Sequence, residues 1–472
     1  MSFPTRRLIT SALALGSAVL PAFGQDVITQ EQLDALESSP SRLSDRSIPL
    51  QYDLVPSRPQ PLFEAGNPYQ GTGSFEHNLF LPGGAVFQPS LLVWGTYRSA
   101  WNETFDEEGR RDVSEWANRL DIFGEYRLSG TERLVVGLRP LDKDGEFYGH
   151  DFKSGEGRSD VNGNIETLFF EGDFGELFPF LDPDDSRALD YGFSVGRQPL
   201  FFQDGVMLND VVDVVGVTRN SKRFWGFSNV RMTGLLGWNE INRGGGPEGD
   251  DATLIGFMVE ADNYDRTIEA DTVYTSGDND SDGLYLGYGS TQRIKGHNTT
   301  FRANASMDMD DEGSLQVDDG LLLSAEISKT LHGSDDVLYI NSFLGIDDYR
   351  SAAQGPASPG PLARTGILFA GSGIGTTGAP LGGASDDSVA VAVGGQKFFS
   401  GGRENVILEV GARYNYDATR SAIATGGRWQ RAWGQHAVFA ADAYTGWDDS
   451  GGANGGFDGG FVGGRFELLF KF

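Results

Sequence analysis

Hydrophobic and polar residues alternate along most of this chain. From about Leu91 onward, segments of roughly ten residues are separated by clusters of Gly, Asp, Asn and Ser. Apolar side chains occupy every second position from Val406 to Tyr416, and the segment Phe301–Met307 has the same period. Successive side chains of a β-strand point to opposite faces, so each segment has one apolar and one polar face. The pattern predicts an all-β protein.

Eighteen segments of this kind predict eighteen strands, and sixteen is the next choice. The predicted strands span residues 90–101, 117–127, 133–140, 164–174, 191–199, 211–219, 229–239, 253–262, 266–275, 283–292, 299–307, 320–329, 336–346, 388–399, 404–416, 423–432, 436–446 and 461–472. Single-chain bacterial outer-membrane barrels have even strand numbers. The count therefore favours a transmembrane antiparallel β-barrel over residues 90–472.

The lengths of the connections support the same architecture. If the first strand starts in the periplasm, most connections on that side are short, apart from 175–190 and 220–228. Those on the other side are mostly long and often acidic, and the longest spans 347–387. Short periplasmic turns and long outer loops are typical of such barrels. The loop 347–387 would either fold into the lumen or extend outside.

The C-terminal strand and the tryptophans indicate contact with lipid. Phe466, Leu468, Phe470 and Phe472 share one face, which would be an aggregation hazard on a soluble edge strand but is satisfied in lipid. Tryptophans fall beside predicted strand ends, where an interfacial girdle belongs, at positions 101, 116, 225, 238, 433 and 447. We expect the outer membrane of a Gram-negative bacterium, with lipid, lipopolysaccharide and the barrel-assembly machinery as partners.

The N-terminal residues are predicted to be an export signal. Residues 1–24 combine Arg6 and Arg7, an apolar stretch Leu8–Leu20, and small residues at Ala22 and Gly24 that suit a cleavage site. The following segment, 25–89, is rich in proline. It would be either a periplasmic tail or a plug in the lumen.

Composition excludes several classes of function. The chain has 37 Lys and Arg against 67 Asp and Glu, a net charge of −30, which argues against nucleic-acid binding. It has no Cys, which removes thiol catalysis and Cys-based zinc sites. The mean hydropathy of −0.31 agrees with strands of which one face meets lipid. Its five His form no catalytic pattern with Ser or Asp, so neither an enzyme nor a cofactor is expected.

The polar faces of the strands supply candidate pore-lining residues. These are Arg98, Arg119, Asp121, Glu125, Arg127, Arg139, Arg231, Arg302, Glu326, Arg413 and Arg465. Barrel closure places the last strand beside the first, so Arg465, Arg98, Arg119, Arg127 and Arg139 would share one wall.

Acidic residues would face this arginine wall. Glu269, Asp271 and Glu326 come from strands nine to twelve, roughly opposite, and the resulting field would orient a charged or polyhydroxyl solute. The alternative is mutual neutralisation, in which Arg119 and Arg127 pair with Asp121 and Glu125 on the same face.

Two short motifs need a structural context to be meaningful. Asp278, Asp280 and Asp282 match the first half of a calcium loop, but position twelve is Gly289, so a weak calcium site or a solvated acidic turn would fit. The run Gly373-x-Gly375-x-x-Gly378 matches a dinucleotide fingerprint but lies in a loop without a following helix, which makes the match compositional.

One stretch resembles a known family. Gly196-Arg197-Gln198, followed by Asp204-Gly205 and preceded by a strand with Glu166, resembles the alginate-export family over residues 165–225. The resemblance implies an eighteen-stranded barrel that exports an acidic polysaccharide, with Arg197 as a contact in the pore. Arg197 has the apolar parity of Tyr191, Phe193 and Val195, so a lumen position would need a bulge near Gly196.

The sequence thus predicts an outer-membrane channel for passive, charge-influenced passage of hydrophilic solutes. An anionic polysaccharide such as alginate is the substrate that the resemblance implies. The alternative is a structural or binding barrel whose acidic external loops engage calcium, surface polymer or a partner protein.

Overall fold

The structure is a computed structural model. It describes residues 59–66, 79–81, 84–109, 112–143, 145–159, 161–184, 188–224, 226–243, 252–277, 282–310, 316–449 and 459–472. The predicted export signal, most of segment 25–89 and Trp225 lie outside these ranges. Within them, no helix is both long and apolar enough to cross a membrane.

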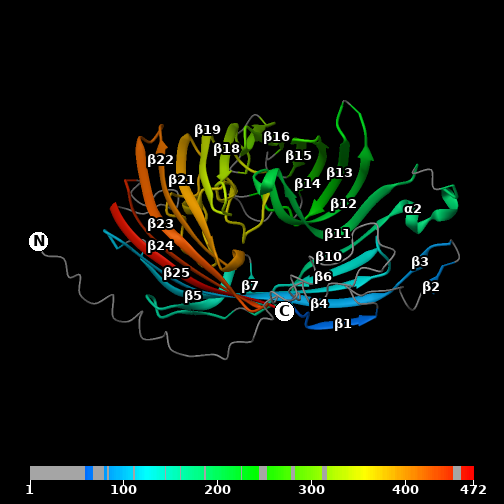
Figure 1. Ribbon diagram of the computed structural model, residues 1–472, viewed down its shortest axis with the longest axis horizontal. Helices are drawn as coiled ribbons and strands as arrows, with labels where there is room; N and C mark the ends of the chain where they lie inside the picture. The colour runs from blue at the N-terminus through cyan, green and yellow to red at the C-terminus, as the bar shows by residue number, and fades with distance from the viewer. Residues whose placement is uncertain are drawn as a thin grey trace, which may run out of the picture. The chain divides into compact units, whose positions relative to one another are not determined.

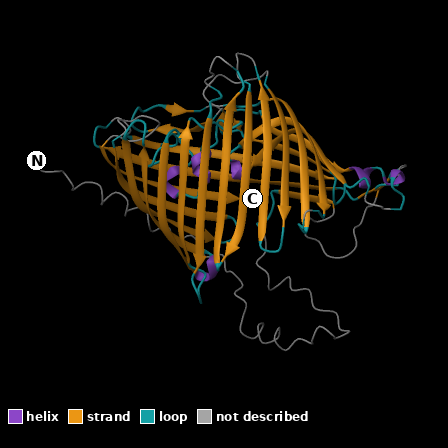
Figure 2. Ribbon diagram, turned by 90° about the horizontal axis from the view of Figure 1, so that it is seen from above, coloured by secondary structure: helices purple, strands orange, loops and turns teal. Residues whose placement is uncertain are grey.

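Eighteen antiparallel strands form a closed barrel, which confirms the predicted fold class and strand number (Figures 1 and 2). The strands are β4 (Ser90–Asp106), β5 (Val113–Arg127), β6 (Arg133–Leu138), β10 (Ile165–Asp173), β11 (Tyr191–Phe202), β12 (Leu208–Lys222), β13 (Asn229–Asn239), β14 (Thr253–Asp262), β15 (Arg266–Ser276), β16 (Gly283–Ile294), β17 (His297–Asp308), β18 (Gly320–Thr330), β19 (Val337–Asp347), β21 (Ser388–Phe399), β22 (Glu404–Asn415), β23 (Arg420–Trp433), β24 (Ala437–Asp448) and β25 (Gly459–Lys471). Each strand pairs with its neighbour in sequence order, and β25 pairs with β4 to close the ring.

Side chains alternate between the lumen and the exterior as the sequence pattern requires. On β16, Tyr285 is completely buried, whereas Leu286 and Tyr288 are 42% and 43% exposed on the opposite face. Large apolar side chains are similarly exposed on the outer faces of the other strands, and Trp101, Trp116 and Trp238 are among them. This exterior is apolar because it meets acyl chains, as in outer-membrane barrels of this kind.

The seam between β25 and β4 is completed by the C-terminal residue. The backbone N–H of Gly95 donates to the carbonyl of Phe472 over 2.8 Å, and the N–H of Phe472 donates back to Gly95 over 3.1 Å. Beyond this point β25 has ended, and β1 (Phe63–Gly66) pairs with the first residues of β4 instead. The backbone of β4 therefore has a partner along its whole length.

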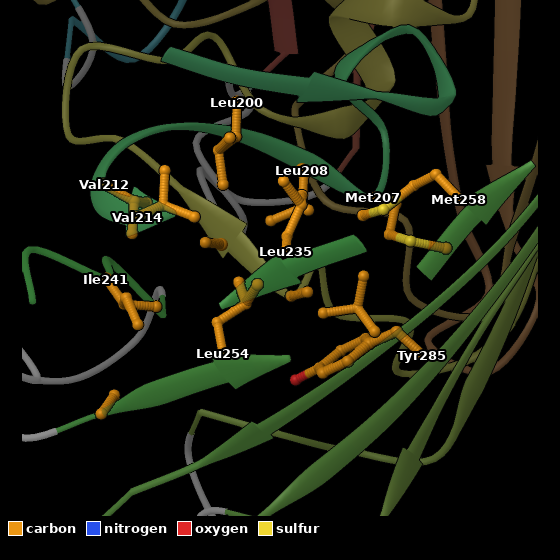
Figure 3. Close-up of a cluster of buried hydrophobic side chains, with 14 of the residues drawn as sticks. Leu200, Met207, Leu208, Val212, Val214, Leu235, Ile241, Leu254, Met258 and Tyr285 are labelled. Carbon is orange, nitrogen blue, oxygen red and sulfur yellow. The ribbon is translucent and has the colours of Figure 1, made fainter. Parts of the chain in front are cut away.

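A hairpin leaves the barrel wall and folds into the lumen. β11 pairs with β10 only as far as Arg197, and β12 pairs with β13 only as far as Asp213, so the hairpin beyond them pairs with itself. Its Leu200, Leu208 and Val212 pack in one apolar cluster with side chains of the wall strands β13 to β16 (Figure 3). The tip carries the 3-10 turn η3 (Gln203–Gly205).

The connection between β19 and β21 also folds inward, which decides between the two expectations for the loop 347–387. It contains β20 (Ala353–Gln354), which pairs with the start of β12, and the 3-10 turns η4 (Pro361–Arg364) and η5 (Leu368–Ala370). Its Leu362, Ile367 and Phe369 are buried against the barrel's inner surface and Val206 of the hairpin tip. We call residues 348–387 the inner loop.

Further short elements complete the chain. The connection between β6 and β10 contains three short strands, β7 (Asp142–Lys143), β8 (Glu146–Asp151) and β9 (Gly157–Arg158). Of these, β8 pairs with residues 115–118 near the start of β5. At the opposite end, α2 (Phe174–Leu177) and η2 (Pro179–Leu181) connect β10 to β11. β2 (Leu79–Phe80) and β3 (Val86–Phe87) form a separate small hairpin, and η6 (Ser400–Gly402) turns β21 into β22.

The close packing at the seam requires a residue without a side chain at position 95. A Cβ there would lie 2.3 Å from the carbonyl oxygen of Asp121 and 2.9 Å from the ring of Phe472. We expect Gly95→Val to destabilise the folded barrel by ~1–3 kcal/mol through overpacking. Gly124→Val on the neighbouring strand is the control, because its Cβ would meet no atom within 4 Å. Heat-modifiable migration in gel electrophoresis measures the folded fraction, and equal loss in both variants would contradict this reason.

Candidate functional site

Two cavities among the described residues border the inward-folded segments. The larger cavity has a volume of about 1390 Å³ and touches the wall strands β4, β5, β23 and β25, the hairpin β11–β12 and the inner loop. The smaller one, of about 490 Å³, lies toward the first residues of β17 and β19 and the end of β18, at the end of the barrel with the short turns. Three residues line both cavities, namely Pro359, Ser372 and Arg428. The two cavities are therefore adjacent at these residues.

A row of arginines covers one wall of the larger cavity. Four of the five arginines that the sequence analysis placed on one wall line it, namely Arg98, Arg119, Arg139 and Arg465, whereas the fifth, Arg127, does not. Arg428, which the sequence analysis missed, also lines it. Arg98 and Arg119 lie directly opposite each other on β4 and β5. Arg428 has the inward parity of the buried Ala422 and Ala424 on β23, so strand periodicity could have identified it.

Carboxylates behind the row hold these guanidinium groups in place. Asp121 accepts hydrogen bonds from Arg119 at 2.9 Å and Arg139 at 3.0 Å. Asp442 pairs with Arg428 at 2.7 Å and with Arg465 at 2.8 Å. Glu467 pairs with Arg98 at 2.6 Å. None of these three carboxylates is among the side chains that line the cavity, so the solute meets the arginines first.

The lining of the larger cavity is more basic than acidic. Its basic residues are Arg98, Arg119, Arg139, Lys143, Arg197, Arg364, Arg428 and Arg465. Its acidic residues are Asp142, Glu166, Asp210, Asp213 and Glu240. The lining thus carries eight positive and five negative groups in a chain whose net charge is −30, while the carboxylates of Asp121, Asp442 and Glu467 lie behind the arginines.

The balance of positive and negative charges on the cavity lining depends on pH through the carboxylate of Asp142, which lies in the connection between β6 and β10. Burial raises the pKa of the Asp142 carboxyl, against the opposing effects of Arg139 and of a hydrogen bond from the N–H of Gly145. A carboxyl with a raised pKa becomes neutral at a higher pH during acidification. The positive excess of the cavity therefore grows as the pH falls.

Arg197 reaches the cavity without the bulge that the sequence analysis required. The pairing of β11 with β10 and with β12 continues through Gly196 without a shift in register, so that expectation was wrong. Because the hairpin folds against the inner wall, the face that carries Arg197, Pro199 and Phe201 borders the cavity instead. Arg197 pairs with Asp213 and Glu240, both at 3.0 Å.

The other predicted pore residues have different places. Glu326 lines the smaller cavity. Arg127 pairs with Glu125 at 2.7 Å, and Arg231 pairs with Glu260, and these residues line neither cavity. On the inner face of β5, Arg119 pairs with Asp121 and Arg127 pairs with Glu125, which are the ion pairs that the sequence analysis gave as its alternative.

Two predicted pore arginines attach the inward-folded segments to the wall. Arg302 is 4% exposed and pairs with Glu269 at 2.7 Å and with Asp204 of the hairpin tip. Arg413 is 9% exposed and donates to the carbonyl of Leu381 in the inner loop. Asp271 is buried and accepts a hydrogen bond from Gln203. The acidic side predicted opposite the arginines is therefore partly covered by the hairpin tip.

The buried carboxylate of Glu115 attaches the inner loop to strand β5. Glu115 of β5 is 1% exposed and accepts hydrogen bonds from the N–H and the hydroxyl of Thr376, at 2.6 and 3.0 Å. It also pairs with Arg158 at 2.5 Å. A Cβ on Gly375, where φ is 116°, would lie 2.2 Å from Glu115, so the loop can approach this closely only with glycine there. We call these contacts the Glu115 latch.

The predicted calcium motif is only partly within the described residues. Asp278 and Asp280 lie outside them, and Asp282 accepts hydrogen bonds from Tyr274 at 2.5 Å and from the N–H of Gly277. In the part of the chain that the structure describes, no three His, Asp or Glu side chains form a group that could hold a metal ion.

Comparison with known proteins identifies the fold. No family model matches the sequence, and no curated protein matches it either. Among solved structures, Pseudomonas aeruginosa OccK2 (OpdF) superposes with a TM-score of 0.53 at 10% identity, over 81% of this chain and 97% of that one. P. aeruginosa OpdK with vanillate gives 0.51 at 11% identity, over 81% and 98%. Acinetobacter baumannii OccAB2 gives 0.50 at 12% identity, over 80% and 98%.

OpdK is an outer membrane protein of P. aeruginosa, and the chain shares the barrel fold of these structures. The predicted localisation in the outer membrane is therefore confirmed. The resemblance to the alginate-export family is confirmed only at the level of an eighteen-stranded outer-membrane barrel.

The carboxylate of Asp121 offsets two arginines of the cavity wall. We expect Asp121→Asn to increase the preference for anions, because Arg119 and Arg139 lose their shared counter-charge. The reversal potential across a planar bilayer with a KCl gradient measures this preference. Asp417→Asn removes an exposed carboxylate in the turn after β22 and should leave it unchanged. A shift toward cations in Asp121→Asn would contradict the assignment.

The Glu115 latch predicts a mobile inner loop when it is broken. Removing one partner of a buried charge pair costs about 3–5 kcal/mol, so Glu115→Ala should free the loop tip from β5. We expect larger current fluctuations and a higher mean single-channel conductance. Glu146→Ala removes an exposed carboxylate from the connection between β6 and β10 and is the matched control. An unchanged conductance trace in Glu115→Ala would show that other contacts hold the loop.

Proposed function

We propose that this protein is a passive channel that favours small hydrophilic anions. The observation that carries the proposal is the positive excess on the lining of the larger cavity, which contrasts with the strongly acidic chain around it. Rings and rows of arginine in a pore attract anions and repel cations. The carboxylates behind the row fix the guanidinium groups in place, so they need little rearrangement when a solute arrives.

The inner loop favours small solutes over a polymer. It crosses the lumen from β19 to the Glu115 latch on β5, and the region between the two cavities is bordered by Pro359, Ser372 and Arg428. A solute that moves from the larger cavity to the smaller one meets Arg428, the charged residue that lines both cavities. A polysaccharide occupies the passage continuously, so the loop would have to stay out of the passage until the whole polymer had crossed.

The solved relatives supply a chemical precedent. One of the similar channels, OpdK, was solved with vanillate, a small aromatic carboxylate. A carboxylate is the group that a guanidinium binds in a bidentate geometry. The resemblance to the alginate-export family would extend the proposal to uronate polymers, whose repeating group is also a carboxylate.

Current block distinguishes these solutes. The purified protein is placed in a planar bilayer, and vanillate or alginate oligomers are added to one side. We expect a conducting pore, with block by vanillate at lower concentration per carboxylate than by the oligomers. Stronger block by oligomers would favour polysaccharide export. A lumen that remains closed after deletion of the inner loop would exclude the channel and favour the structural or binding barrel.

The arginine wall predicts the effect of charge removal. In a water-filled lumen with an effective dielectric constant of ~20–80, one charge about 8 Å from an ion changes its energy by roughly 0.5–2 kcal/mol. Arg98→Ala and Arg119→Ala should therefore each reduce the anion-to-cation permeability ratio at least about twofold. Arg231→Ala, whose side chain lines neither cavity, is the control. Equal reversal potentials in all three variants would refute the role of the wall.

A further inference from the structure

An aromatic segment protrudes at the end of β10 and β11 that the sequence analysis assigns to the periplasmic side, where most connections between strands are short. It consists of α2, η2 and the residue between them, and it exposes Phe174 (36%), Phe178 (40%), Phe180 (60%) and Leu181 (60%). The neighbouring hairpin β2–β3 exposes Leu79 (55%), Phe80 (76%), Leu81 (38%) and Val86 (40%). We call these two elements together the aromatic arm. Within the residues that the structure describes, these apolar side chains are only partly covered, although several of their rings contact one another.

The arm is continuous with the lipid-facing exterior of the barrel. Phe193 lies on the outer face of β11 between the exposed Tyr191 and Val195. Its ring is 4.5 Å from that of Phe174. From there a chain of aromatic contacts runs outward, with ring centroids 6.5 Å apart for Phe174 and Phe178 and 6.2 Å apart for Phe178 and Phe180. The aromatic surface therefore begins on the barrel wall and extends away from it.

Both elements of the arm are attached close to the points where strands leave the bilayer. Asp173, the last residue of β10, caps the first turn of α2 by accepting from the N–H of Gly175 at 2.8 Å. β3 ends at Phe87, just before β4 begins at Ser90. The two elements also lie close together, since a Cβ built on Gly84 would come within 3.4 Å of the Pro179 ring (Figure 1). These short tethers hold the arm at the depth of the periplasmic membrane surface.

We propose that the aromatic arm inserts into the inner leaflet of the outer membrane, where acyl chains and phospholipid headgroups cover its apolar side chains. Aromatic residues favour this boundary, and amphipathic segments bury their apolar face there. The arm is amphipathic, because Glu176 is exposed on the same segment and Asp184 is exposed three residues after it. The inference does not depend on what the channel conducts.

The size of the patch favours lipid over a second copy of the chain. It comprises eight large apolar side chains, whereas a stable protein interface contains roughly 20–30 residues on each side. Lipid needs no complementary surface, and it already covers Phe193 and its neighbours on the barrel wall.

Site-directed spin labelling tests the proposal directly, because the chain has no Cys. Phe180→Cys and Phe80→Cys are labelled in the full barrel protein, which is then reconstituted in phosphatidylethanolamine and phosphatidylglycerol vesicles. Collision with oxygen reports lipid exposure, and collision with a water-soluble nickel chelate reports water exposure. Leu338→Cys, on the outer face of β19 near its periplasmic end, is the lipid reference. Tyr264→Cys, in a periplasmic turn and 100% exposed, is the water reference.

We expect both arm labels to show a several-fold higher oxygen-to-nickel collision ratio than Tyr264→Cys, close to that of Leu338→Cys. Glu176→Cys, on the same segment, should resemble Tyr264→Cys. Arm labels with the ratio of the water reference would overturn the proposal. The arm labels could instead be shielded from both oxygen and the nickel chelate in vesicles but become accessible when each lipid nanodisc holds one barrel. That result would also overturn the proposal, because it would show that a second copy of the chain covers the arm. Phe80→Cys gives an independent result if Phe180→Cys fails to fold.

Discussion

The structure depends on the pairing of every backbone polar group inside a bilayer. Unpaired N–H and C=O groups cost several kcal/mol each in hydrocarbon, so a membrane-spanning sheet must close on itself. Here the closure is made by β25 and β4, with β1 continuing the pairing beyond the end of β25. Closure fixes which side of each strand faces lipid, and it therefore fixes which charges share the lumen. The arginine wall exists because the seam brings β25 and β4 together beside β5.

The barrel itself was predictable from the sequence because its signal is local. A period of two marks the strands, and exposure on β16 follows it from the buried Tyr285 through the exposed Leu286 to the exposed Tyr288. Strand order in such a barrel follows chain order, so no long-range pairing had to be guessed. The placement of Arg98, Arg119 and Arg465 on one wall followed from closure alone.

The contents of the lumen were not predictable in the same way. The hairpin β11–β12 continues its alternation after it has left the wall, so parity no longer distinguishes lumen from lipid for Arg197. Arg302 and Arg413 have inward parity but are covered by segments distant in sequence. Gly373 and Gly375 matched a dinucleotide motif in the sequence, but their role in the structure is different. The inner loop approaches Arg465 and Glu115 so closely there that a Cβ would clash with these side chains.

The seam also constrains how the protein comes into being. Arg98 and Glu467, whose side chains meet across it, are separated by 369 positions in the chain. Contacts this distant in sequence cannot form until nearly all intervening strands have been synthesised and exported. Until then the edges of β4 and β25 are open templates for pairing with other chains. Closure of the seam is therefore also the step that removes the last open strand edges of the barrel.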